Sequence, residues 1–202
     1  KVKDLNIYYS NTNNIIAKVL NNKLYFIFQQ KLYVSDGTTT GTIQITNVTN
    51  VGNYLFENNG FVFFFGNNNN YGREIWKTDG SVAGTTVVKD INAGTNSSII
   101  YGYEKMYQFN NKIVFIAMDN NYNLGLWSTD GSSINTTSFY PLSNNSVFYD
   151  FDFQNYDKLL FTVNGDLWKT DGTSVGTNLI YNSIPPINKL SYYKNKIYID
   201  TN

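Results

Sequence analysis

A short pattern that repeats four times along the chain constrains its fold more than any other feature. In each copy an aromatic residue stands three positions before an Asp-Gly pair, as in Ile-Trp-Lys-Thr-Asp-Gly at 75–80. The acids are Asp36, Asp79, Asp130 and Asp171, and the aromatic residues before them are Tyr33, Trp76, Trp127 and Trp168. The acids are therefore 43, 51 and 41 residues apart, which indicates an architecture with one structural unit per copy.

Two further anchors accompany each Asp-Gly pair. Five residues after the Asp, the four copies carry Gly41, Gly84, Asn135 and Gly176, each followed by Thr. Because Gly and Asn tolerate positive φ better than other residues, this exchange predicts a left-handed backbone at that position. Ahead of each Asp, an Asn-Asn pair or a substitute opens the segments 21–26, 58–63, 110–115 and 156–161, and a fifth copy opens 194–199 without an Asp-Gly pair after it; this anchor predicts a hairpin turn.

Each unit is expected to hold four antiparallel strands. The short apolar runs at 61–65 and 113–117 lack alternation, which is typical of strands covered on both faces. Four strands in a unit of roughly 40–50 residues predict an all-β fold, a β-propeller of four-stranded antiparallel blades.

The predicted blades follow one another without a second domain. They span residues 15–48, 53–91, 103–142 and 150–182. Residues 1–9 are predicted to be the last strand of a preceding blade, because Val-Lys-Asp-Leu at 2–5 matches Val-Lys-Asp-Ile at 88–91. Residues 188–202 are predicted to start a further blade. We therefore expect residues 1–202 to be one β-propeller segment of a longer protein.

The composition excludes several classes of partner and site. The formal net charge is zero, from 15 basic and 15 acidic residues, and the chain has no His and no Cys. Nucleic-acid-binding proteins carry a basic surface, so a nucleic acid is not an expected partner. No apolar run is long enough for membrane insertion. Without His and Cys the chain lacks disulfides, the usual zinc ligands and a His-based triad, and no cofactor is expected.

The segment 74–91 resembles the ELWxxDGT repeat. It combines Glu-Ile-Trp, Asp-Gly and Gly-Thr at fixed offsets, and the resemblance extends over four copies, with departures at Tyr33 and Asn135. These repeats occur in large secreted or surface proteins of bacteria. The resemblance thus implies a secreted or cell-surface location rather than an activity. The Asp loop is also similar to the Asp-box hairpins of sialidase-type propellers, which are structural there.

The repeated Asp and Trp residues are interpreted as structural. Each Asp carboxylate is expected to accept backbone N–H bonds within its own loop. Calcium binding is the minor alternative, because each loop offers a single acid where calcium needs several oxygens. Trp76, Trp127 and Trp168 are expected to pack between blades, with a sugar-stacking platform as the alternative.

The loops at the other end of the strands differ between blades and supply the candidate binding site. The turns at 29–30 and 164–165 are tight, whereas 66–73, 92–103 and 119–123 are longer and rich in Asn and Tyr, a composition suited to recognition. The candidate ligand-binding residues are Asn68, Tyr71, Arg73, Asn96, Tyr101, Tyr103, Asp119 and Tyr122.

The functional hypothesis is a non-enzymatic binding or adhesion module that recognises a carbohydrate or a surface protein through this loop face. A glycosidase is a less favoured alternative, because it needs two carboxylates roughly 5–10 Å apart. Beyond the repeated acids the best candidates, Asp119, Asp150 and Asp152, form no recognisable constellation. A structural spacer in a large surface protein is the other alternative.

Overall fold

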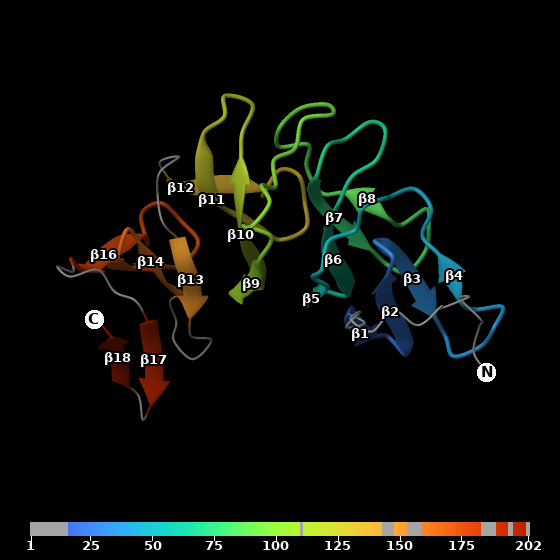
Figure 1. Cartoon of the computed structure of the whole chain (residues 1–202), viewed down its shortest axis with the longest axis horizontal. Coiled ribbons are helices and arrows are strands. Elements are labelled where there is room, and N and C mark those ends of the chain that lie inside the picture. Colours follow the sequence, from blue (N-terminus) through green and yellow to red (C-terminus); the bar gives the residue numbers. More distant parts are fainter. Residues whose placement is uncertain are drawn as a thin grey trace.

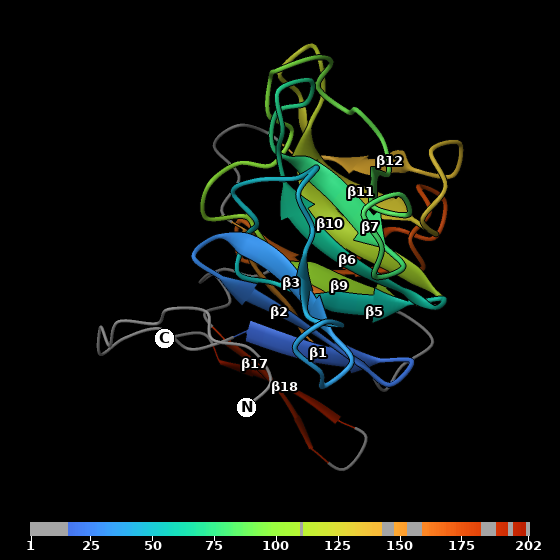
Figure 2. The ribbon, with the colours of Figure 1, turned by 90° about the vertical axis from the view of Figure 1, so that its right-hand side faces the viewer.

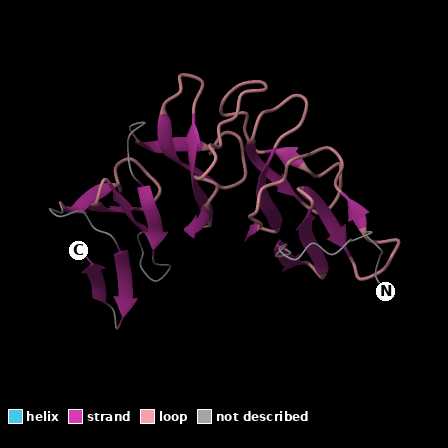
Figure 3. Cartoon of the chain, viewed as in Figure 1, coloured by secondary structure: helices cyan, strands magenta, loops and turns pink. Residues whose placement is uncertain are grey.

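The computed structural model describes residues 16–109, 111–142, 148–152, 159–182, 189–193 and 196–200. These residues form strands, turns and loops, and no helix is present among them (Figure 3). Accordingly, this part of the chain contains no helix long and apolar enough to cross a membrane. The strand predicted at residues 1–9 lies outside the described residues.

Four four-stranded sheets and one two-stranded sheet follow one another along the chain. The first sheet consists of β1 (Ile16–Leu20), β2 (Lys23–Phe28), β3 (Lys31–Ser35) and β4 (Ile43–Gln44). The second consists of β5 (Phe56–Asn58), β6 (Phe61–Gly66), β7 (Glu74–Thr78) and β8 (Thr86–Val87). The third consists of β9 (Met106–Phe109), β10 (Lys112–Met118), β11 (Leu124–Thr129) and β12 (Thr137–Pro141). The fourth consists of β13 (Phe148–Asp152), β14 (Leu159–Val163), β15 (Asp166–Thr170) and β16 (Asn178–Tyr181), and the last pair is β17 (Lys189–Tyr193) with β18 (Lys196–Asp200).

Every sheet is an antiparallel meander in which strands pair in chain order. The sheets succeed one another along an arc, from β1–β4 at one end to β17–β18 at the other (Figure 1). Figure 2 looks onto the first sheet and shows the next sheets behind it. The predicted all-β fold of repeated four-stranded antiparallel units is confirmed.

The core lies between consecutive sheets. In β6 the side chains of Val62 and Phe64 join a buried cluster with the first sheet, whereas Phe63 and Phe65 join a cluster with the third sheet. All four are 0% exposed. This two-sided burial explains why the apolar run at 61–65 does not alternate with polar residues.

Short turns join the first and second strands, and some of the second and third. Asn21 and Asn22 have φ of 49° and 59°, and Gln29 and Gln30 have 48° and 58°. Two successive residues with positive φ form the turn type that matches the twist of a two-residue hairpin. Asn59 and Gly60 form the equivalent turn of the second sheet, with φ of 50° and 79°.

Each Asp-Gly loop is closed by its own carboxylate. In the second sheet Asp79 accepts hydrogen bonds from the backbone N–H and the hydroxyl of Ser81, both at 2.8 Å. The Ser81 hydroxyl in turn accepts the N–H of Gly84 at 2.9 Å. Those bonds from Ser81, the hydroxyl first, lower the pKa of Asp79. The prediction that Asp79 and Asp171 bind backbone N–H groups within their own hairpins is confirmed.

Two threonines complete the loop. The hydroxyl of Thr85 donates to the carbonyl of Ser81, so Thr78 is the donor in the 2.6 Å hydroxyl pair that it forms with Thr85. Thr78 also accepts the N–H of Gly80. The corresponding pairs are Ser35 with Thr42, Thr129 with Thr136, and Thr170 with Thr177. We refer to this arrangement of carboxylate, three hydroxyls and turn as the Asp cassette.

The predicted left-handed backbone at Gly41, Gly84, Asn135 and Gly176 is wrong. Positive φ occurs instead at the Gly that follows each Asp, for example 93° at Gly80. The glycine five residues after the Asp is there for space: a Cβ on Gly84 would lie 2.1 Å from the Asp79 carboxylate. In the third cassette Asn135 occupies this place, and its amide donates to Asp130 at 2.6 Å.

The repeated aromatic residues lie between sheets. Trp76, only 2% exposed, belongs to the cluster between the first two sheets, and its indole N–H donates to the Gly66 carbonyl at 2.9 Å. Trp127 and Trp168 are partly buried against the next two clusters. Trp168 also lies 5.0 Å from the Tyr140 ring of the third sheet. These contacts account for an aromatic residue at the same place in every copy.

Candidate functional site

The irregular loops lie at the end of the strands opposite to the Asp cassettes. Residues 66–73 enter β7 at its start, whereas the Asp cassette leaves it at its end. Because the sheets are antiparallel meanders, the connection 88–105 from β8 to β9 and the loop 119–123 lie at the same end as residues 66–73. These three segments form the upper edge of the arc in Figure 1.

Backbone and side-chain hydrogen bonds join the three irregular segments to one another. Gly72 donates its N–H to the carbonyl of Gly94 at 2.9 Å. Met118 donates to the carbonyl of Ser98 at 2.8 Å, and the amide oxygen of Asn120 accepts the N–H of Ala93. Residues 92–98 therefore bridge the loops of the second and third sheets.

A buried carboxylate holds this bridge in place. Glu74, at the start of β7, is 0% exposed and accepts N–H bonds from Ile91 at 3.2 Å, Asn92 at 3.4 Å and Ser98 at 3.1 Å. The Ser98 hydroxyl donates to it as well. Burial raises the pKa of Glu74 to about 7, although the hydrogen bonds from Ser98, Ile91 and Asn92 act in the opposite direction.

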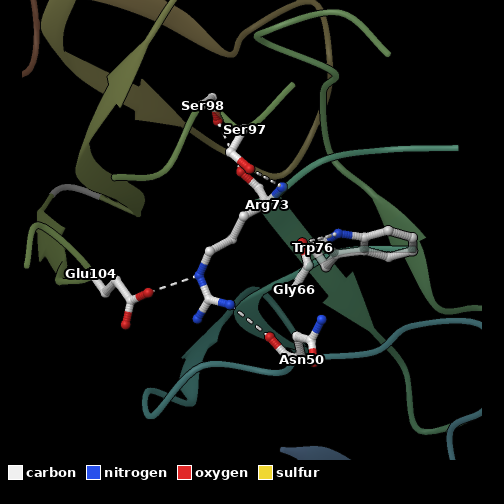
Figure 4. A network of polar contacts seen from close by, with 7 residues as sticks. All are labelled: Asn50, Gly66, Arg73, Trp76, Ser97, Ser98 and Glu104. Carbon is white, nitrogen blue, oxygen red and sulfur yellow. Dashed lines mark hydrogen bonds and ion pairs between the residues drawn. The ribbon is translucent and has the colours of Figure 1, made fainter. Parts of the chain in front are cut away.

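Arg73, the neighbour of Glu74, connects the same segments through its backbone and its side chain. Its N–H donates to the Ser97 hydroxyl at 2.9 Å, and its carbonyl accepts the N–H of Ser98 at 3.1 Å. Its guanidinium lies between Glu104 and Asn50 (Figure 4), with Nε 2.8 Å from Oε1 of Glu104 and Nη1 donating to the Asn50 carbonyl at 2.7 Å. The side chains of Arg73 and Glu104 are each 20% exposed, so the ion pair is shielded but reachable.

The ion pair forms one wall of a shallow pocket of about 240 Å³. Its lining comes from the β2–β3 turn, the β4–β5 connection, the residue before β7 and the β8–β9 connection. Its lining residues are Gln30, Asn50, Val51, Gly52, Asn53, Arg73, Tyr101 and Glu104. Tyr101 is 92% exposed, so its ring is free to contact a ligand. We call this feature the Arg73 pocket.

Two of the eight predicted ligand-binding residues, Arg73 and Tyr101, line the Arg73 pocket. Tyr71 packs edge-on against Trp76 at 6.0 Å, and Tyr103 packs partly buried against the cluster between the third and fourth sheets. The Asn68 amide ties its loop to the carbonyl of Asn47. These three residues make contacts that stabilise the fold, and they do not line the pocket.

The remaining three predicted residues lie on the loops outside the pocket. Asn96 is exposed on the bridge, and Tyr122 is 61% exposed at the tip of residues 119–123. Asp119 closes that loop by accepting the N–H groups of Asn121 and Asn123. Burial would raise the pKa of Asp119, but the hydrogen bonds from Asn123 and Asn121 outweigh it and lower the pKa. Asp150 and Asp152 lie in β13, whose side chains lie outside the described residues.

The sequence interpretation missed Glu74 and Glu104 as site residues. Glu74 stands where the other copies have Lys31, Gly125 and Asp166, so its difference from them was a visible signal. Glu104 carries no such signal, because it becomes Arg73's partner only when the long connection folds back. Among the described residues, no group of three or more acids is arranged to hold a metal ion.

Comparisons with known proteins found likenesses among solved structures at low sequence identity. No family model matches the sequence, and no curated protein matches it. Puromycin hydrolase is similar in structure over 80% of this chain and 29% of its own, with 14% identity and a TM-score of 0.49. The complex of the fission yeast SREBP–SCAP binding domains matches over 93% and 56%, with 12% identity and a TM-score of 0.43. The WD40 domain of fission yeast SCAP matches over 88% and 44%, with 13% identity and a TM-score of 0.40.

This chain thus spans less than two thirds of the length of each of those proteins. At these identities and TM-scores no functional inference follows from the likeness.

Proposed function

We propose that the sheets are consecutive blades of a β-propeller and that the chain is a non-enzymatic binding module of a secreted or cell-surface protein. The regular meanders along one arc support the propeller assignment, and the resemblance to ELWxxDGT repeats supports the location. The ligand is a neutral carbohydrate, taken up by the Arg73 pocket.

The observation that carries this proposal is the make-up of the pocket wall. An Arg–Glu pair of no net charge lines the pocket together with two amide residues, Gln30 and Asn53, and with the exposed Tyr101. Sugars need donors and acceptors for their hydroxyls and a flat apolar surface for their C–H face, and these side chains offer both. The small volume suits a single sugar unit rather than a drug-sized ligand.

The same wall is poorly equipped for catalysis. Among the described residues that line the pocket, Glu104 is the one carboxylate, and it is paired with Arg73. Glycoside hydrolysis by the usual routes needs two carboxylates on opposite sides of the scissile bond. The proposed role is therefore recognition without turnover.

A structural spacer is the second candidate, and the four matching Asp cassettes favour it. They reinforce each four-stranded sheet with the same hydrogen bonds to the Asp carboxylate, and the added contact of Asn135 with Asp130 is a departure confined to one loop. A spacer, however, requires neither the bridge over 92–98 nor the pocket beside it.

A glycan array with the intact chain tests the proposal, followed by titration of each hit. We expect binding to neutral glycans that is strongly reduced in Tyr101→Ala and retained in Tyr122→Ala, a matched exposed tyrosine outside the pocket. Tyr101→Phe keeps the ring and should keep most of the affinity. Absence of any glycan binding would favour the spacer. Binding that is equal in Tyr101→Ala and wild type, or binding to a surface protein alone, would remove the pocket from the proposal.

A further inference from the structure

We propose that the Arg73–Glu104 pair recognises two adjacent hydroxyl groups of the bound sugar, one accepting from Nη2 of Arg73 and the next donating to Oε2 of Glu104. This inference rests on the proposed function and names the ligand class that the pocket selects: a sugar with a free vicinal diol.

One terminal nitrogen of the guanidinium, Nη2, is left for a ligand, because Nε is buried in the ion pair with Glu104. Nε faces Glu104 and Nη1 donates to Asn50, whereas Nη2 makes no hydrogen bond to a described residue (Figure 4). A Cβ at residue 52 would lie 2.4 Å from Nη2, so the glycine there leaves room for this nitrogen in the wall. Nη2 is thus a charged donor at the pocket whose position is already fixed by the two other nitrogens.

The carboxylate likewise has one oxygen left. Oε1 of Glu104 is 2.8 Å from Nε of Arg73, and Oε2 makes no hydrogen bond to a described residue. An ionised carboxylate accepts hydrogen bonds and cannot donate them. The wall therefore presents a charged donor and a charged acceptor on two partnered side chains.

This combination discriminates between ligand classes. A hydroxyl both donates and accepts, so two neighbouring hydroxyls can satisfy Nη2 and Oε2 together, and hydrogen bonds to ionised groups are the stronger kind. A ligand carboxylate or phosphate could accept from Arg73 but would meet Glu104 as a like charge. A ligand with an isolated hydroxyl would form a hydrogen bond with only one of Nη2 and Oε2. The other atom would lose its contact with water and gain no partner in return.

The inference is tested with the intact chain and with methyl glycosides of glucose, galactose, mannose and fucose, together with their monodeoxy derivatives. Saturation-transfer NMR finds which glycosides bind, and calorimetry gives their affinities. For the best glycoside, we expect removal of either of two adjacent hydroxyls to weaken binding about tenfold or more, which corresponds to about 1.4 kcal/mol. Removal of the other hydroxyls should change binding less than twofold. The methyl glucuronide should bind more weakly than the methyl glucoside.

The variant Glu104→Gln should lose about as much affinity as the sensitive deoxy sugars and should no longer distinguish them from the parent. Asp119→Asn, outside the pocket, is the control. If Glu104→Gln does not fold, the deoxy series on the wild-type chain still decides. Tyr101-dependent binding that tolerates every single deoxygenation, or tighter binding of the glucuronide, overturns the diol inference and leaves the proposed function standing. If none of the glycosides binds and the array is also negative, the proposed function itself fails.

Discussion

The two ends of the sheets follow different rules. At one end the Asp cassette occurs four times with the same hydrogen bonds, from Asp36 to Asp171. At the other end the connections range from the two-residue turn at 29–30 to the connection between β8 and β9, and the buried Glu74 occurs in one sheet only. Local, repeated hydrogen bonding therefore builds the array, whereas contacts between distant segments build the candidate site.

Trp76 connects the two ends of the sheets, and its removal should lower the stability of the chain the most. Trp76 belongs to the repeat, but its ring touches Tyr71 of the irregular loop and its indole donates to Gly66. Trp76→Ala should lower the free energy of unfolding by about 3–5 kcal/mol, because a large buried side chain leaves a cavity. Urea denaturation measures this.

Trp127→Ala and Trp168→Ala serve as the comparison, since both side chains are partly exposed. Each should cost less than Trp76→Ala. Equal losses of unfolding free energy for all three variants would mean that the contacts shared by the repeats determine what the Trp contributes. The irregular loop would then add nothing to the stability at Trp76.

The second prediction concerns the buried acid of the irregular end. Glu74 has a folded-state pKa of about 7 against an ordinary value of 4.5. A raised folded pKa means that its contribution to stability is fully present below about pH 4.5 and is lost as the pH rises through about 7. The difference between the two pKa values corresponds to a loss of about 3 kcal/mol in the free energy of unfolding between pH values well below 4.5 and well above 7.

Urea unfolding of the wild type between pH 4.5 and 8.5 should show this decline. Glu74→Gln, which is neutral at every pH, should flatten the profile over that range. The protection of the amide hydrogens of Ile91, Asn92 and Ser98, measured relative to their intrinsic exchange rates at each pH, should fall over the same range in the wild type. A profile that is identical in the wild type and Glu74→Gln would show that Glu74 keeps its charge at no cost in stability.

The structure of the end with the Asp cassettes could be predicted almost completely from the sequence, because its pattern is local. The spacing of Asp79 and Trp76 from their counterparts predicts the sheets, and an Asp-Gly pair predicts a turn closed by its carboxylate. The hydroxyl two residues after each Asp, such as Ser81, could also have been found, since all four copies carry Ser or Thr there. The role of Gly84 could not, because steric space beside a carboxylate and a positive φ call for the same residue.

The candidate site was predicted only in outline. The long, Tyr- and Asn-rich loops indicated which end to examine, and two of their residues, Arg73 and Tyr101, line the pocket. The pairing of Arg73 with Glu104 and Asn50 joins segments that are 23 to 54 residues apart (50 to 104). Such contacts depend on how three sheets are placed relative to one another, and no local pattern encodes that.

The third prediction tests the steric role of glycine in the Asp cassette. Gly84→Ala should destabilise the chain by about 1–3 kcal/mol, because the new Cβ displaces the Asp79 carboxylate without adding the amide contact that Asn135 makes to Asp130 in the third cassette. A double-mutant cycle with Asp79→Ala isolates this contact. The glycine substitution should cost clearly less once the carboxylate is absent. Equal costs in both backgrounds would point to a backbone requirement at residue 84 instead.

The smallest effect is expected where the repeat departs from itself. Asn135 replaces the glycine in the third cassette, and its amide donates to the carboxylate of Asp130. The Ser132 hydroxyl first, and then the amide of Asn135, lower the pKa of Asp130. Asn135→Gly removes the second contact, so the pKa of Asp130 should rise, while that of Asp79 stays as it is.

The free energy of unfolding should fall by about 1 kcal/mol or less, since the site is exposed and the change costs one hydrogen bond and some backbone entropy. NMR titration of the side-chain carboxyl carbons measures both acids in the same sample. An unchanged Asp130 in this variant would falsify the view that Asn135 compensates for the missing glycine by binding the carboxylate, and it would make the third cassette a tolerated exception rather than a second solution to the same loop.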